Sequence, residues 1–197
     1  MRRGKRTREA PRSGQLRLIA GQHGGRRLRF PDAGGVRPTP DRVRETLFNW
    51  LAPTLVGESA LDLFAGSGAL GLEALSRGAA RVDFVERDRR LVAALKQNLN
   101  LLGAEDKASV HGMEVEKYLG SPLPDSPYGL VFLDPPYDAG LYGPVLEALQ
   151  AGAWLKPGAQ IYLEYRSHNP PPEIPPAWIW TRQSTAGDVT YGLITTS

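Results

Sequence analysis

The sequence contains no cysteine and only three histidines, which lie far apart among its 197 residues. Disulfide bonds and thiolate metal sites are therefore excluded, and we expect no histidine-based metal site either. No apolar run approaches the roughly 20 residues of a membrane-spanning helix, and the charged N-terminus lacks the apolar segment of a secretory signal. The length suits one main globular domain. A cytoplasmic, monomeric protein is the simplest interpretation.

Acidic residues are scarce in the N-terminal quarter of the chain, whereas they outnumber basic residues in the remainder. Residues 1–44 hold 13 Lys and Arg against 3 Asp and Glu, whereas residues 45–197 hold 11 against 18. A basic N-terminal quarter on an acidic body indicates a polyanion that docks at one end. The alternative is a tail that is merely well solvated.

The N-terminal segments divide into a basic tail and a predicted hairpin. Residues 1–14 have almost nothing to bury, so we expect a disordered tail. Residues 15–36 hold two alternating runs around a Gly-Gly pair, which is typical of a β-hairpin. In these runs Arg17, Arg27 and Arg29 alternate with apolar residues. One face of the hairpin should therefore be apolar and the other basic, and we interpret it as an RNA-binding extension.

The remainder, residues 37–197, reads as one α/β domain. Its first helix should begin with Thr39 as N-cap and Pro40 at the first helical position. Strands then alternate with helices, which predicts a parallel sheet covered on both faces. The expected strands are 59–64, 81–86, 107–112, 128–134 and 159–165, and the longer helices are 69–78, 89–103 and 143–155. A proline-rich connection leads to 177–196, which reads as a closing antiparallel hairpin.

The segment "LDLFAGSGALG" places glycines at positions 66, 68 and 71, between a strand and a helix. Such glycines allow a sharp turn and a close approach of the backbone to a ligand. Glu86 follows Gly66 by 20 residues, at the end of the next strand, where a carboxylate can bind ribose hydroxyls. This pattern indicates a nucleotide-like ligand, against the alternative of a tight turn with a surface glutamate.

Asp62 lies in the strand four residues before Gly66. An anion at that position is unfavourable beside the pyrophosphate of a dinucleotide. It suits instead the ammonium and sulfonium groups of S-adenosyl-L-methionine. This difference favours S-adenosylmethionine over NAD.

The segment "LVFLDPPYDAG" ends a buried strand in Asp134, Pro135, Pro136 and Tyr137. This strand is expected next to the first, so the four residues should face the same crevice as the glycine loop. Proline fixes its own backbone and restricts the residue before it. The Asp134 carboxylate and the Pro135 carbonyl then form two acceptors suited to a flat amino group, and Tyr137 offers a face for base stacking. The alternative is that the prolines simply end a strand.

These motifs resemble those of amino-methyltransferases, and together they are similar to one family in particular. The segments "LRLIAGQHGGRRLRFP", "RPTPDRVRETLFNWL", "LDLFAGSGALGLEALSRGA", "VERD" and "VFLDPPY" resemble the RsmD family. That family comprises bacterial enzymes that methylate the 2-amino group of one guanine in 16S rRNA. The resemblance implies a Rossmann-like class I methyltransferase fold with a seven-stranded, mostly parallel sheet, an antiparallel C-terminal hairpin and an N-terminal β-hairpin extension.

The resemblance also implies roles for individual residues and a substrate. The cofactor would be held by Asp62, Phe64, Gly66, Ser67, Gly68, Glu86, Arg87 and Glu114, and the target guanine by Asp134, Pro135, Pro136 and Tyr137. The RNA-binding candidates are Arg17, Arg27, Arg29, Arg37, Thr39, Arg42 and Arg44, of which the last four could instead close the cofactor pocket. The implied partner is 16S rRNA within the small ribosomal subunit or an assembly intermediate.

Three other functions remain open at this point. An Asp-Pro-Pro-Tyr segment also suits methylation of DNA adenine or of a glutamine amide. An NAD-dependent oxidoreductase is disfavoured by Asp62 and by the lack of a placed catalytic Lys, Tyr or His. An inactive RNA-binding assembly factor is disfavoured by the intact Gly66, Gly68, Glu86 and Asp134.

Overall fold

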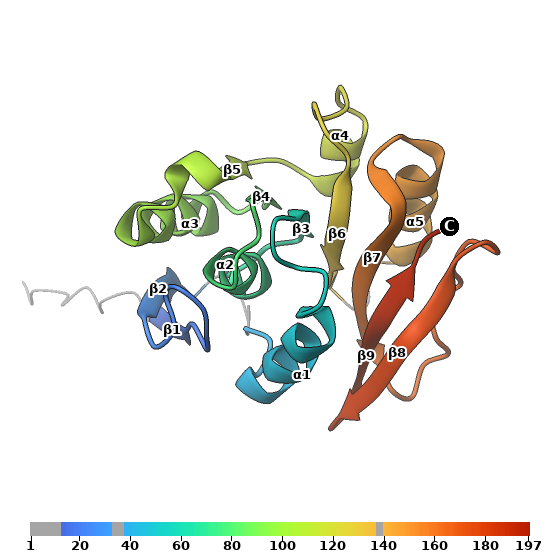
Figure 1. The fold of residues 1–197 in the computed structure, drawn as a ribbon, viewed down its shortest axis with the longest axis horizontal. Helices are drawn as coiled ribbons and strands as arrows, with labels where there is room; N and C mark the ends of the chain where they lie inside the picture. Colours follow the sequence, from blue (N-terminus) through green and yellow to red (C-terminus); the bar gives the residue numbers. More distant parts are fainter. Residues whose placement is uncertain (1–12, 33–37, 137–139) are drawn as a thin grey trace, which may run out of the picture.

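The computed structural model describes residues 13–32, 38–136 and 140–197. A seven-stranded sheet runs through the molecule in the order β5-β4-β3-β6-β7-β9-β8 (Figure 1). Its strands are β3 (Ser59–Leu63), β4 (Arg81–Val85), β5 (Ala108–His111), β6 (Tyr128–Leu133), β7 (Leu155–Arg166), β8 (Ile179–Ala186) and β9 (Val189–Thr195). The first five are parallel, and β9 pairs antiparallel with both β7 and β8. The predicted fold, with its closing hairpin, is therefore confirmed.

Helices cover both faces of the sheet. They are α1 (Asp41–Leu51), α2 (Ala69–Ser76), α3 (Arg89–Leu102), α4 (Val115–Leu119) and α5 (Tyr142–Ala151), with a short 3₁₀ turn at Glu105–Lys107. Successive residues of a strand point to opposite faces. In β6, Phe132 packs with the residues of α1, α2 and α3, whereas Leu133 packs with those of α4 and α5. Across the part of the chain that the structure describes, no helix is long and apolar enough to cross a membrane.

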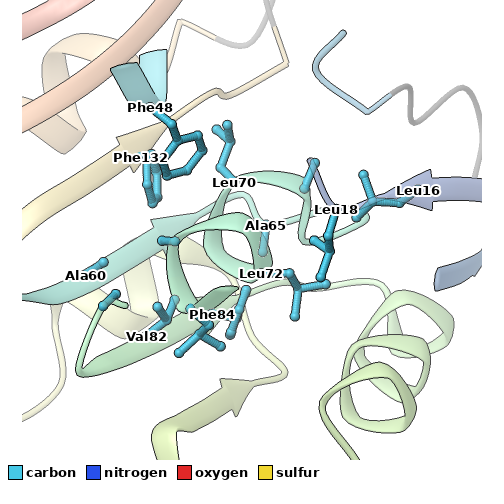
Figure 2. Close-up of a cluster of buried hydrophobic side chains, with 14 of the residues drawn as sticks. Leu16, Leu18, Phe48, Ala60, Ala65, Leu70, Leu72, Val82, Phe84 and Phe132 are labelled. Carbon is cyan, nitrogen blue, oxygen red and sulfur yellow. The ribbon is translucent and has the colours of Figure 1, made fainter. Parts of the chain in front are cut away.

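The N-terminal hairpin shares the main hydrophobic core. Strands β1 (Ser13–Arg17) and β2 (Arg27–Pro31) pair antiparallel, as predicted. Leu16, Leu18, Leu28 and Phe30 are buried in the same cluster as the residues of α2 and α3. Figure 2 shows Leu18 beside Leu72 of α2. The hairpin is therefore packed onto the sheet domain rather than set apart from it.

A buried glutamate on α2 joins the hairpin to the sheet domain. Glu73 is fully buried and accepts hydrogen bonds from the backbone N–H groups of Ile19 (2.8 Å) and Ala20 (3.1 Å). It also forms ion pairs with Arg44 of α1 (3.2 Å) and with Arg77, which follows α2 (2.7 Å). Three segments far apart in the sequence thus meet at one carboxylate.

Some boundaries differ from the predicted ones. Helix α1 begins at Asp41 with Pro40 as N-cap and without a side-chain cap, so the expected capping by Thr39 is wrong. Residues 13 and 14 belong to β1 rather than to the predicted disordered tail, and residues 1–12 lie outside the described part. Strand β7 begins four residues before the predicted start at 159. Pairing between Tyr128 and Leu155 extends it toward the N-terminus past Pro157 and Gly158.

Candidate active site

A cavity of about 1030 Å³ lies at the carboxyl ends of the parallel strands. Its walls come from the turns after β3, β4, β5 and β6, from the segment before α1, and from the start of β9. The lining residues fall within 38–40, 62–70, 85–91, 113–116 and 134–136, together with Leu141 and Val189. Strands β3 and β6 are neighbours there, so the structure brings the glycine loop and the Asp-Pro-Pro segment together as the sequence indicated.

Three residues in the turn after β3 have positive φ angles, a backbone conformation that glycine adopts more easily than other residues. Gly66 and Gly68 have φ angles of 54° and 78°, in the left-handed region that favours glycine. A Cβ atom on Gly68 would also collide with the side chain of Leu95 on α3. Phe64 has a φ angle of 62°, which is rare for a residue with a side chain and is often found at binding sites. The loop therefore packs tightly against α3 on one side and lines the cavity on the other, where Ser67 also contributes.

Asp62 is a buried carboxylate at this wall. Its side chain is almost fully buried and accepts a hydrogen bond from the N–H of Gly71, at 2.9 Å. Burial raises the pKa of Asp62 to about 7, and the nearby Glu86 adds to this, while the Gly71 hydrogen bond acts in the opposite direction. A cation bound beside Asp62 would relieve the cost of ionising it.

Glu86 links the first two βα turns. One carboxylate oxygen accepts a hydrogen bond from the N–H of Gly66 (2.8 Å), and the other accepts one from the N–H of Asp88 (2.7 Å). A carboxylate has about four lone-pair sites, so each oxygen can still accept from a hydroxyl group. Both backbone contacts fix the carboxylate at the cavity wall, in a position suited to a diol.

Arg87 and Glu114 lie at the rim of the same cavity. They form an exposed ion pair, with 3.5 Å between the guanidinium and the carboxylate. Met113, which is partly exposed, lies next to Glu114 in the lining. The predicted cofactor residues that line the cavity are therefore Asp62, Phe64, Gly66, Ser67, Glu86, Arg87 and Glu114, while Gly68 shapes the turn behind it.

Asp134 follows β6 directly and lines the cavity with Pro135 and Pro136. Burial raises the pKa of Asp134 well above its ordinary value, and the negative charges of Glu164 and Asp62 raise it further. A carboxylate with a raised pKa is a better proton acceptor than an ordinary aspartate. Tyr137, predicted as the stacking residue, lies outside the described part of the chain.

Sequence reasoning missed Glu164, a second carboxylate near Asp134. It is 5% exposed and lies on β7, which is the neighbour of β6. Tyr162 donates a hydrogen bond to its Oε1 at 2.6 Å, and Tyr142 donates one to its backbone oxygen at 2.6 Å. The available signal was its place at the end of an apolar strand, beside the strand that ends in Asp134. In the described segments, no group of three or more His, Asp or Glu side chains is arranged to hold a metal ion.

The predicted RNA-binding residues fall into two groups. Arg17, Arg27 and Arg29 are exposed on the hairpin, and Arg42 is exposed on α1. Thr39 is buried and lines the cavity. Arg37 lies outside the described residues.

Arg44 does not fit the expectation that it serves RNA phosphates. It is 1% exposed, and its guanidinium donates to Glu73, to Asp41 at 2.6 Å and to the backbone oxygens of Arg17 (2.9 Å) and Thr39 (3.2 Å). These contacts occupy the guanidinium inside the protein. The bond to Thr39 instead supports a segment of the cavity wall, which is the other role considered for this residue.

Comparison with known proteins identifies the family. A family model described as "Conserved hypothetical protein 95" matches residues 16–195. Ribosomal RNA small subunit methyltransferase D of Escherichia coli strain K12 is 46% identical over 181 residues, which are 92% of this chain and 90% of that protein. The chain belongs to the ribosomal RNA small subunit methyltransferase D family. The Haemophilus influenzae protein of the same name is 41% identical, over 91% of this chain and 93% of its own length.

Solved structures of similar proteins have the same fold. A putative methyltransferase from Escherichia coli, yhhF, superposes with a TM-score of 0.85 at 42% identity and covers 93% of this chain and 99% of its own. A T. thermophilus 16S rRNA N2 G1207 methyltransferase, RsmC, in complex with AdoMet and guanosine, gives a TM-score of 0.67 at 21% identity. It covers 96% of this chain and 51% of its own, and at that identity the likeness shows only the class I methyltransferase fold.

Proposed function

We propose that the protein transfers a methyl group from S-adenosylmethionine to the 2-amino group of one guanine in 16S rRNA of the small ribosomal subunit. The observation that carries this proposal is the position of Asp134, whose carboxylate lies on the same cavity wall as the glycine loop and Asp62. The part of the cavity beside Asp62 thus suits a cationic cofactor, and the part beside Asp134 suits a flat amine. Membership of the family supports the ribosomal RNA substrate.

The cavity residues fit S-adenosylmethionine. Asp62 is buried, and its pKa is raised, so an ammonium or sulfonium group nearby would stabilise its charged form. Glu86 would accept from the ribose hydroxyls, and the exposed Glu114, which lines the cavity at its rim, would accept from the adenine amine. The solved structure with AdoMet and guanosine supports the pairing of this cofactor with this base in the same fold.

Asp134 is the residue proposed to act on the amine. S-adenosylmethionine supplies a methyl group already activated by its sulfonium, so the remaining difficulty is the weak nucleophilicity of the amine, whose lone pair is delocalised into the base. Hydrogen bonds from the amine to Asp134 and to the Pro135 carbonyl favour a tetrahedral nitrogen and stabilise the positive charge that develops on it. The fixed backbone of the two prolines holds both acceptors in position.

The reaction also requires that a proton leaves the amine. The nitrogen would gain a bond to the methyl carbon as the methyl–sulfur bond breaks and leaves a neutral thioether. The nitrogen would then lose one proton, and the carboxylate of Asp134 or a water molecule would accept it. The raised pKa of Asp134 favours the carboxylate as the acceptor. A paired base cannot reach the cavity, so the target guanine must be flipped or single-stranded.

The hairpin supplies the proposed surface for RNA. Its exposed Arg17, Arg27 and Arg29 project from strands whose apolar residues are fixed in the core. Contacts of this kind bind phosphates irrespective of base sequence and are sensitive to salt. The proposal places the reaction in the cytoplasm, on the small subunit or an assembly intermediate, with the protein acting as a monomer.

The proposed function is tested by labelling. The protein is incubated with tritiated S-adenosylmethionine and 30S particles from cells that lack this gene, and the RNA is digested to nucleosides. We expect label in 2-methylguanosine at one site of 16S rRNA. If the particles remained unlabelled while the protein still bound S-adenosylmethionine, the proposed RNA substrate would be wrong. The methylated group would then be sought in DNA adenine or a protein amide. Particles from wild-type cells serve as the control, because their site is already methylated.

A further inference from the structure

A second cavity, of about 400 Å³, lies beside the candidate active site. It is formed by the start of α5, by the carboxyl end of β7 and by residues 169–173 of the proline-rich connection between β7 and β8. Figure 1 shows α5 beside β7. Its lining includes Gly140, Tyr142, Gly143, Tyr165, Asn169 and Glu173. A cavity of this volume is large enough to hold a small ligand.

The two cavities share one wall. Leu141 lines the candidate active site, whereas the residues before and after it, Gly140 and Tyr142, line the second cavity. Burial raises the pKa of Tyr142, and the negative charge of Asp134 raises it further, so the two side chains lie near one another. The second cavity is therefore reached from Asp134 across the turn that leads into α5.

The walls of the second cavity are largely apolar and fixed in place. Residues 170–172 are three consecutive prolines, whose backbone is restricted. The hydroxyl of Tyr142 donates to the backbone oxygen of Glu164 at 2.6 Å, which holds the tyrosine ring in one position. Tyr165 is 8% exposed, and its ring centre lies 6.2 Å from that of Trp180. Walls of this kind lose little conformational entropy when a flat ring binds against them.

Polar groups are present at the mouth of the same cavity. Asn169 and Glu173 line it and are exposed to solvent. The amide of Asn169 can donate and accept hydrogen bonds, whereas the carboxylate of Glu173 accepts them. Unpaired RNA bases are bound in this way, with aromatic or apolar groups against their faces and hydrogen bonds at their edges. The lining therefore suits a nucleobase.

The RNA substrate brings such a base to this position. The target guanine is linked through the backbone to one nucleotide on each side, so its two neighbours stay within one backbone unit of the active-site entrance. When the target leaves the stack, these neighbours lose its face as a stacking partner. A protein surface that stacks on one of the neighbours would replace part of that interaction.

We propose that the second cavity binds the base of a nucleotide adjacent to the target guanine and so holds the RNA strand in its flipped conformation. This proposal rests on the proposed function. The ring of Tyr142 and the three prolines contact the faces of the base, and Asn169 and Glu173 contact its edge. The cavity acts on recognition of the RNA and leaves the binding of S-adenosylmethionine unchanged.

The cavity can be blocked at Gly143. A Cβ atom added to this residue would meet no atom within 4 Å, and its φ angle is not in the positive region, so a side chain is compatible with the helix. Gly143→Phe should therefore fold and place its ring in the cavity. Gln150→Phe adds the same ring at an exposed position about two turns further along α5, outside the lining, and is the matched control.

The test uses small-subunit particles assembled with 16S rRNA in which the 5′ or the 3′ neighbour of the target guanosine is an abasic residue. For the wild-type protein, loss of one of these two bases should lower kcat/KM by roughly 5- to 100-fold relative to intact particles. Gly143→Phe should be slower on intact particles by a similar factor, and neither abasic residue should slow it further by more than about two-fold. Gln150→Phe should behave as the wild type.

A second variant decides the question if Gly143→Phe folds poorly. The double substitution Asn169→Ala, Glu173→Ala shortens two exposed side chains and leaves the walls in place. It should lower kcat/KM on intact particles by roughly 3- to 10-fold, with no such loss on particles that lack the bound base. Affinity for S-adenosylmethionine, measured by calorimetric titration, should match the wild type in every variant.

The outcomes separate this proposal from the proposed function. A wild-type protein that methylates both abasic particles as fast as intact ones would overturn the nucleotide as the occupant. If Gly143→Phe were nevertheless slow on every particle, the cavity would be assigned to a protein of the particle instead. An equal loss on an abasic particle in the wild type and in folded Gly143→Phe would also overturn the proposal, because the base would then bind elsewhere. Absence of 2-methylguanosine from intact particles would overturn the proposed function, and this proposal with it.

Discussion

At the scale of single residues, the cavity is defined by carboxylates that are costly to ionise. Asp62 and Asp134 both have raised pKa values, for which burial is the main cause and neighbouring negative charges contribute further. Such shifts concentrate at functional sites because binding and proton transfer need groups that are poised to change charge. The two residues have different proposed tasks, so substitutions should separate cofactor binding from turnover.

Substitution of Asp134 should abolish turnover and spare the cofactor site. In Asp134→Ala the amine has no carboxylate acceptor, and we expect kcat to fall by at least about 100- to 1,000-fold. Asp134→Asn keeps the shape and should be nearly as inactive, because the amide cannot take a proton. Calorimetric titration should show S-adenosylmethionine affinity within a few-fold of wild type. Strong activity in Asp134→Ala would contradict the assignment.

Asp62 should make the free protein less stable as the pH rises. Its pKa is about 7 in the folded protein, against an ordinary value of 3.8. Between these values the unfolded chain releases the proton and the folded protein retains it, so stability falls with rising pH. Asp62→Asn should therefore gain stability relative to wild type between pH 4 and pH 7, by up to about 4 kcal/mol. Urea unfolding at several pH values measures the difference, and a pH-independent difference would contradict it.

At the scale of secondary-structure elements, Glu73 holds the α1 helix, the α2 helix and the segment after β1 together. Its ionic partners are Arg44 of α1 and Arg77 at the end of α2, and its backbone partners are residues 19 and 20. Arg44 also holds the oxygen of Thr39 at the cavity wall. The ion pair thus connects the attachment of the hairpin to the shape of the cofactor site.

Removing one partner of the Glu73–Arg44 ion pair should lower the free energy of unfolding more than replacing both partners with apolar residues. Glu73→Leu leaves the buried guanidinium of Arg44 without its carboxylate, and we expect the free energy of unfolding to fall by about 3–5 kcal/mol. Arg44→Met should cost a similar amount. The double variant should be destabilised by less than the sum of the two, because both charges are gone. Urea unfolding of the four proteins measures the coupling, and additive effects would argue against a functional pair.

The sequence predicted the elements better than the contacts between them. Periodicity and glycine positions located the strands, the helices and the hairpin, because those signals are local. Asp134 could be placed beside the glycine loop because parallel strands end at one edge of the sheet. Arg44 was predicted either to bind RNA phosphates or to close the cofactor pocket, and its burial was not foreseen, since it depends on Glu73, 29 residues away. Glu164 was missed for the same reason, because only the pairing of β6 with β7 brings it to Asp134.

At the scale of the whole molecule, the basic hairpin lies at one side and the β8–β9 hairpin, which forms one edge of the sheet, lies at the other (Figure 1). The hairpin arginines are exposed, whereas the leucines and the phenylalanine between them are buried. The basic side and the cavity belong to one folded unit, because the hairpin shares the core of α2 and α3.

Removal of the hairpin arginines should lower the affinity for RNA and make that affinity less dependent on salt concentration. In the triple variant Arg17→Gln, Arg27→Gln, Arg29→Gln, the slope of log affinity against log salt should shrink by about one unit for each phosphate that the protein no longer neutralises. S-adenosylmethionine affinity should not change. Arg182→Gln, at an exposed position on β8, is the matched control and should keep the wild-type slope. An equal slope in the triple variant would exclude the hairpin as the RNA surface.

The position of β9 has a consequence for how the chain is made. Strand β9 lies between β7 and β8, although both are synthesised before it. Until β9 emerges, β8 has no neighbour in the sheet and β7 presents an open edge with apolar residues on both faces. Open apolar edges favour association between chains. A nascent or truncated chain that ends before Val189 should therefore be prone to aggregate and depend on chaperones. It would also lack Val189, which lines the cavity, so the last strand both closes the sheet and completes the lining of the cavity.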